Sequence, residues 1–161
     1  MPDPIDLPPS ARRVAEAAAA LGLAIEIRAF PEGTRTAEDA ALAVGCDVAQ
    51  IVKSLVFVAG DAPVLALVAG HHRLDEAKLA ALAGTGTVRR ASADEVREAT
   101  SYAVGGVPPF GHPAPVPSWV DLDLLERPVV WAAAGTPRHV FAVEPRSLVT
   151  AIGATPADLA G

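Results

Sequence analysis

Apolar positions recur along the chain with two spacings, one typical of helices and one typical of strands. A helix is predicted between Ser10, a candidate N-cap, and Gly22, because the apolar residues between them repeat every three or four positions. Thr36 is a second candidate N-cap, and Ser92 begins a Ser-Ala-Asp-Glu capping box. The predicted helices cover residues 10–22, 37–45, 74–84, 92–99 and 146–154.

Short apolar runs bounded by glycine, proline and polar residues predict the strands. Residues 51–59 and 64–70 give the clearest signal, because both runs are rich in β-branched residues and a Gly-Asp-Ala-Pro turn joins them as a hairpin. The other predicted strands cover residues 24–30, 87–91, 119–125, 128–135 and 139–145.

The order of these elements predicts the fold class. Helices and strands are interleaved, but their spacing is too irregular for repeated βαβ crossovers. This pattern favours a single α/β domain of the α+β type over residues 1–161, with a mainly antiparallel mixed sheet or partly open barrel and helices outside it. A doubly wound fold is the alternative, although no GxGxxG or GxxxxGK[ST] motif follows a strand. The proline-rich residues 1–9 are expected to form a flexible leader.

Composition narrows the classes of function. Hydrophobic residues make up 51% of the chain, yet no run approaches the roughly 20 apolar residues of a membrane helix. The net charge of −6 argues against a protein that coats long stretches of nucleic acid. The lone Cys46 cannot form an internal disulfide, and the N-terminus lacks the features of a secretory signal. A cytoplasmic protein that does not bind membranes is therefore expected.

Lys53 is the most conspicuous charged residue, because it interrupts an otherwise apolar predicted strand. A buried ammonium group needs a partner. Either this lysine extends to solvent from the start of the strand, or its ammonium lies at a cavity mouth and holds a phosphate or carboxylate.

Residues 105–117 contain five prolines and three glycines and are too apolar for a solvated linker. We expect a loop folded against a cavity, where exposed backbone N–H groups form an oxyanion hole. A rigid turn without a catalytic role is the alternative.

The remaining reactive side chains give no recognised catalytic motif. The four histidines, His71, His72, His112 and His139, lack HxxxH or HExxH spacing, so neither a metal nor another cofactor is expected. Cys46 has no evident base beside it and is expected to be a small buried residue. No GxSxG motif occurs, which leaves covalent catalysis without support.

Six segments, taken in order, closely resemble the YbaK/prolyl-tRNA synthetase-associated domain family over about residues 10–155. They are TAEDAALAVG, IVKSLVFV, VLALVAGHHRLDEAKLAAL, GGVPPFGHP, VVWAAAGTPRHVF and PRSLVTAIGA. The resemblance implies a barrel-like α/β fold and hydrolysis of mischarged aminoacyl-tRNA. Because no synthetase domains accompany the chain, we expect it to act in trans on the CCA end of tRNA, with a synthetase as a further candidate partner.

The resemblance also implies a set of site residues. Lys53 matches the lysine that positions a backbone phosphate of the CCA end, and Gly105, Gly106 and Pro109 match the loop that cradles the aminoacyl carbonyl. Gly135 and His139 resemble a late glycine and a histidine found in some members. The expected catalytic residues are Lys53, Gly105, Gly106 and His139, and the expected substrate-binding residues are Thr36, Ser54, Pro109, Phe110, Gly111 and Gly135.

The expected mechanism is attack by water, assisted by the free hydroxyl of the terminal ribose, because an activated ester needs mainly positioning and oxyanion donors. Two other classes of function remain open. The pocket could bind an aminoacyl group or nucleotide without turnover, or the chain could be a regulatory partner of a synthetase.

Overall fold

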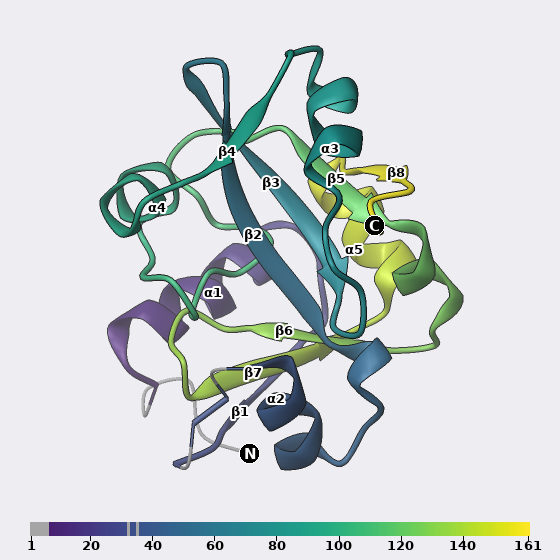
Figure 1. Cartoon of the computed structure of the whole chain (residues 1–161). Helices are drawn as coiled ribbons and strands as arrows, with labels where there is room; N and C mark the ends of the chain where they lie inside the picture. The colour runs from purple at the N-terminus through teal and green to yellow at the C-terminus, as the bar shows by residue number, and fades with distance from the viewer. Residues whose placement is uncertain (1–6, 32, 35) are drawn as a thin grey trace.

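The computed structural model describes residues 7–161 except residues 32 and 35, and in this part of the chain it contains two β-sheets and five α-helices (Figure 1). The three-stranded sheet has the order β1 (Glu26–Ala29), β7 (His139–Val143), β6 (Val130–Ala133). The five-stranded sheet has the order β4 (Val88–Arg90), β2 (Val52–Ala59), β3 (Ala62–Ala69), β5 (Ser118–Asp121), β8 (Thr155–Ala157).

Strand pairing is antiparallel throughout the three-stranded sheet and mixed in the five-stranded one. Strand β2 pairs antiparallel with β3 and β4, whereas β5 runs parallel to β3 and β8. A parallel bridge between Ile51 and Trp131 connects the two sheets. The mainly antiparallel, barrel-like α/β fold expected from the sequence is confirmed, and the doubly wound alternative is wrong.

The helices begin and end at residues with clear capping roles. Thr36 caps α2 by accepting the Asp39 N–H at 3.0 Å, and Ser92 and Glu95 form both bonds of the predicted capping box. The helices are α1 (Pro9–Ala20), α2 (Ala37–Val44), α3 (Glu76–Ala83), α4 (Ala93–Thr100) and α5 (Pro145–Ile152). None of the helices in the described part of the chain is long and apolar enough to cross a membrane.

Strand β3 is buried on both faces, which explains its continuous apolar sequence. Leu65 and Leu67 pack into the main core with Phe141 of β7, and all three are fully buried. The alternate residues of β3 pack on the other side, against Leu79 of α3 and Leu159. Complete burial of such side chains stabilises the fold by about 1.5–3 kcal/mol each.

Two local expectations were wrong. Ser10 does not cap α1, because Pro8 precedes the helix and Pro9 occupies its first position, where a missing N–H costs nothing. The predicted strand 119–125 ends early: Asp121 accepts the Asp123 N–H at 3.0 Å and begins a short 3₁₀ helix, η3 (Leu122–Glu126). The sequence also gave no signal for the short strand β8.

The start of the described chain is packed rather than free. Leu7 is 6% exposed and belongs to the main core. Residues 7–9 of the expected leader are therefore part of the fold, while its first six residues lie outside the described part of the chain.

Candidate active site

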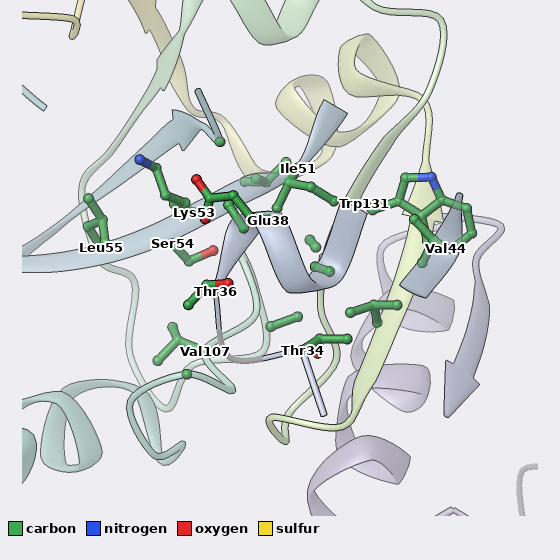
Figure 2. A pocket seen from close by; sticks show the side chains of 18 of the residues that line it. Thr34, Thr36, Glu38, Val44, Ile51, Lys53, Ser54, Leu55, Val107 and Trp131 are labelled. Carbon is green, nitrogen blue, oxygen red and sulfur yellow. The ribbon is translucent and has the colours of Figure 1, made fainter. Parts of the chain in front are cut away.

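A cavity of about 400 Å³ lies between the start of α2, one edge of β2 and the loop before Pro108 (Figure 2). Its lining residues are Thr34, Thr36, Ala37, Glu38, Ala40, Val44, Ile51, Val52, Lys53, Ser54, Leu55, Gly70, Val104, Gly105, Val107, Trp131, Ala132, Ala133 and Val140. Figure 2 shows Lys53 and Ser54 toward one end of this group, and Val44 and Trp131 at the other. We call the end at Lys53 and Ser54 the polar end, although the apolar side chain of Leu55 also lies there.

The cavity lies where one hydrogen-bonding edge of β2 has no neighbouring strand along part of its length. Strand β4 pairs with β2 only between Phe57 and Ala59, and no described strand pairs with Lys53–Leu55 on that side. The Ala91 N–H donates to the Val56 carbonyl, so even-numbered residues of β2 direct their backbone groups to this edge. The N–H and C=O of Ser54 therefore face the cavity, and such unpaired strand groups can bind a ligand.

Lys53 lines the cavity and is half-buried. Its ammonium donates a hydrogen bond to the backbone carbonyl of His72. Burial lowers the pKa of Lys53, and the negative charges of Glu38 and Asp121 partly offset that shift. A lysine ammonium has three N–H donors, so the bond to His72 leaves donors for an anion.

Two hydroxyl groups lie near this polar end. Thr36 accepts the Asp39 N–H with its side-chain oxygen, so its own hydroxyl proton remains available. The Ser54 hydroxyl oxygen is buried without a hydrogen-bond partner among the described residues. Burying an unpaired hydroxyl is costly, which makes Ser54 suited to contact a bound polar group.

The two adjacent glycines of the loop have different roles. Gly105 lines the cavity at φ 91°, a conformation that favours glycine, and within the described part of the chain its N–H makes no backbone hydrogen bond. The Gly106 N–H is donated to the Ala103 carbonyl at 3.0 Å, and its carbonyl accepts the Gly135 N–H at 2.9 Å. Of the two glycines, only Gly105 therefore has an N–H without a backbone hydrogen bond in the described part of the chain.

Gly106 and Gly135 allow a close backbone contact instead. A Cβ on Gly106 would lie 2.9 Å from the backbone of Gly135, and a Cβ on Gly135 would lie 2.6 Å from the Ser10 carbonyl oxygen. Neither glycine lines the cavity. Their function is to hold the loop against the β6–β7 turn and α1.

The second half of the loop faces away from the cavity. Phe110 is 4% exposed and packs against Phe141 in the main core, with ring centroids 5.5 Å apart. Gly111 approaches the Ala17 side chain of α1. Pro109, Phe110 and Gly111, expected from the sequence to bind substrate, are not among the cavity-lining residues.

His139 also lies outside the cavity. Its neighbour Val140 lines the cavity, and successive strand residues point to opposite faces, so His139 is directed to the other side of β7. Its Nδ1 lies 2.6 Å from the Thr136 hydroxyl, and burial lowers its pKa. A catalytic contact by His139 with a ligand in this cavity is not supported by its position.

Cys46 offers no nucleophile to the cavity. Burial and the negative charge of Asp47 raise the pKa of its thiol, which disfavours the reactive thiolate. Cys46 is half-buried and lies beside the small apolar cluster around Trp131.

Of the lining residues, only Thr36, Lys53, Ser54 and Gly105 were expected from the sequence, and Glu38, Val107 and Trp131 are among those it did not indicate. Glu38 lies within the predicted helix 37–45 and Trp131 within the predicted strand 128–135, and neither was singled out. Each comes from a different segment, and no local pattern indicates that these segments meet.

Comparisons with known proteins identify the family of this chain. A model of the family described as "Aminoacyl-tRNA editing domain" matches residues 31–151. The uncharacterized protein YwhH of Bacillus subtilis (strain 168) is 31% identical over 124 residues, which cover 76% of this chain and 78% of that protein. The proline–tRNA ligase of Lactobacillus gasseri is 42% identical over 62 residues, 38% of this chain but only 11% of the ligase.

A solved structure gives the most extensive of these matches. It is described, provisionally, as a trans-editing enzyme for prolyl-tRNA synthetase, is 50% identical, and superimposes with a TM-score of 0.92 over 97% of this chain and 99% of that one. Together with the family match, this similarity shows that the chain belongs to the aminoacyl-tRNA editing domain family, the YbaK/prolyl-tRNA synthetase-associated group.

Proposed function

We propose that this chain hydrolyses the ester bond of mischarged aminoacyl-tRNA in trans, with water as the nucleophile and the terminal ribose assisting. The observation that carries the proposal is the cavity, which both Lys53 and Gly105 line. Among the described lining residues there is no histidine or cysteine to act as base or nucleophile. Such a site positions and polarises a substrate that already carries an activated ester.

In this proposal Lys53 binds the phosphate next to the terminal adenosine. Its ammonium is fixed by the His72 carbonyl and retains donors for phosphate oxygens. A lysine acts as a point charge toward phosphate. In this proposal, one such contact positions the end of the tRNA. This local contact is compatible with a protein of net charge −6.

Glu38 binds the α-ammonium group of the aminoacyl moiety. It is the only carboxylate among the described residues that line the cavity. Glu38 is exposed, and its negative charge raises the pKa of Lys53. A cationic amine and an anionic phosphate, both present at the end of an aminoacyl-tRNA, would thus each meet the opposite charge.

The reaction then needs only water and the substrate. Water attacks the ester carbonyl carbon, and the neighbouring ribose hydroxyl orients the water and relays its proton. The Gly105 N–H stabilises the negative charge on the former carbonyl oxygen. The bond to the esterified ribose oxygen breaks, this oxygen takes the relayed proton, and free amino acid and uncharged tRNA leave. Because aminoacyl-tRNA is made and used in the cytoplasm, we place the chain there.

Incubation of the purified chain with a panel of tRNAs carrying cognate and non-cognate amino acids tests the proposal. Proline tRNA charged with small non-cognate amino acids is the first set, given the similarity to a trans-editing protein for that synthetase. We expect catalytic turnover of at least one mischarged species and none of the cognate one. Stoichiometric binding of aminoacyl-tRNA without release of amino acid would instead identify a binding module.

A further inference from the structure

We propose that His71, His72 and Asp123 form a binding site for a transition-metal dication such as Zn²⁺. His71 and His72 occupy the turn after β3, and Asp123 belongs to η3. One ligand atom from each side chain lies within 4.8 Å of the others. None of the three lines the cavity, so this site is separate from the proposed hydrolytic site and does not depend on it.

The orientation of His72 is set by a buried carboxylate. Its Nδ1 lies 2.7 Å from Asp121 Oδ2, and Asp121 is only 3% exposed. An ionised carboxylate only accepts hydrogen bonds, so Nδ1 carries the proton and Nε2 keeps its lone pair. A carboxylate behind a histidine is the usual support for a metal-binding imidazole.

Asp121 also ties together the two segments that supply the ligands. It accepts the Ala69 N–H at 3.1 Å at the end of β3 and the Asp123 N–H at 3.0 Å at the start of η3. The hydrogen bonds of Asp121 therefore fix the backbone of both segments relative to each other, although the segments are far apart in sequence.

Asp123 is held in a similar way. Arg127 donates to Asp123 Oδ2 at 2.9 Å, and the His71 Nε2 lies 3.6 Å from the same oxygen. A carboxylate that binds metal is commonly anchored by such a neighbour.

The ligand types select the class of ion. Two imidazoles and one carboxylate suit Zn²⁺ and similar first-row ions, whereas Mg²⁺ and Ca²⁺ prefer oxygen ligands. Tetrahedral binding at zinc distances needs ligand atoms about 3.3 Å apart, so a modest side-chain rotation is required. The side chains of His71, His72 and Asp123 are 35%, 27% and 26% exposed, which leaves room for it.

The site adjoins the residue proposed to bind phosphate. Lys53 donates to the backbone carbonyl of His72, so an ion that fixes this turn also fixes the acceptor of Lys53. We therefore expect the metal to stabilise the turn rather than to take part in hydrolysis.

Calorimetric titration of the chelator-treated chain with zinc chloride tests the proposal. The Cys46→Ser background removes the single thiol as a competing ligand. We expect one ion per chain, a rise in Tm with zinc and no comparable effect of magnesium. His72→Ala and His71→Ala should each weaken binding at least tenfold, and Asp121→Asn by about 10- to 100-fold through loss of ligand support.

The matched control is His112→Ala, which removes a histidine that contacts the Pro108 carbonyl on another part of the surface. Its zinc affinity should equal that of the parent. Circular dichroism checks that each variant is folded. If His72→Ala does not fold, His71→Ala provides the test, because His71 is exposed. Absence of stoichiometric zinc binding, or equal affinity in His71→Ala and the parent, would overturn the proposal whatever the outcome of the deacylation assay.

Discussion

The two halves of the glycine- and proline-rich loop look alike in sequence but face opposite ways in the fold. Gly105 and Val107 line the cavity, whereas Phe110 lies in the main core and Gly111 lies against α1. Gly106, between them, connects the loop to the β6–β7 turn through the Gly135 N–H.

This contrast separates residues that can touch a substrate from residues that hold them in place. A substitution in the first group should change turnover with little effect on stability. A substitution in the second group should change stability and leave the turnover of the folded fraction nearly intact.

The largest expected effect is on stability, in the core half of the loop. Phe110→Ala removes a buried ring that packs on Phe141 and should lower the free energy of unfolding by about 3–5 kcal/mol. Chemical denaturation measures this loss and gives the folded fraction under assay conditions, by which the measured turnover is divided. Loss of turnover without loss of stability would show that Phe110 contacts the substrate.

Gly106→Ala should be the next most destabilising change. The new Cβ would lie 2.9 Å from the Gly135 backbone, and relief of such a contact costs about 1–3 kcal/mol. Gly86→Ala is the matched control, because nothing lies within 4 Å of its Cβ position. If both variants unfold at the same denaturant concentration, the proposed packing of the loop is wrong.

Lys53→Ala should act mainly on turnover. Loss of a charged hydrogen bond worth about 1.5–3 kcal/mol corresponds to a roughly 10- to 100-fold lower kcat/KM. Lys78→Ala is the control, because Lys78 binds Asp158 and does not line the cavity. Equal kcat/KM for Lys53→Ala and Lys78→Ala would show that Lys53 does not bind the substrate.

His139→Asn should have the smallest effect. Its side chain points away from the cavity, and asparagine can retain a polar contact with Thr136. We expect kcat/KM to change by less than about threefold, or roughly 0.6 kcal/mol. A drop of two orders of magnitude with an intact fold would restore the catalytic role that the family resemblance suggested.

The sequence predicted those features that depend on neighbouring residues. The β2–β3 hairpin and the caps at Thr36 and Ser92 follow from local turn and capping chemistry, and all three are present. Lys53 was conspicuous because a charge interrupts an apolar strand, and the structure places it at the cavity with Gly105.

What the sequence did not predict depends on packing between distant segments. The direction of His139 follows from the register of β7, and the burial of Phe110 follows from the position of Phe141. Glu38 and Trp131 line the cavity only because α2 and β6 meet there. No pattern within a single segment carries this information.

In the proposed mechanism the protein positions the ester, and the substrate supplies the proton transfer. The most direct measurement compares two forms of the same mischarged tRNA, one ending in adenosine and one in the deoxyadenosine that lacks the hydroxyl beside the ester. With the wild-type chain we predict hydrolysis of the deoxy form slower by about 10²–10⁴-fold, the usual range for a positioned proton-transfer group. Equal rates for the two forms would contradict proton transfer by the ribose hydroxyl and would require a base supplied by the protein itself.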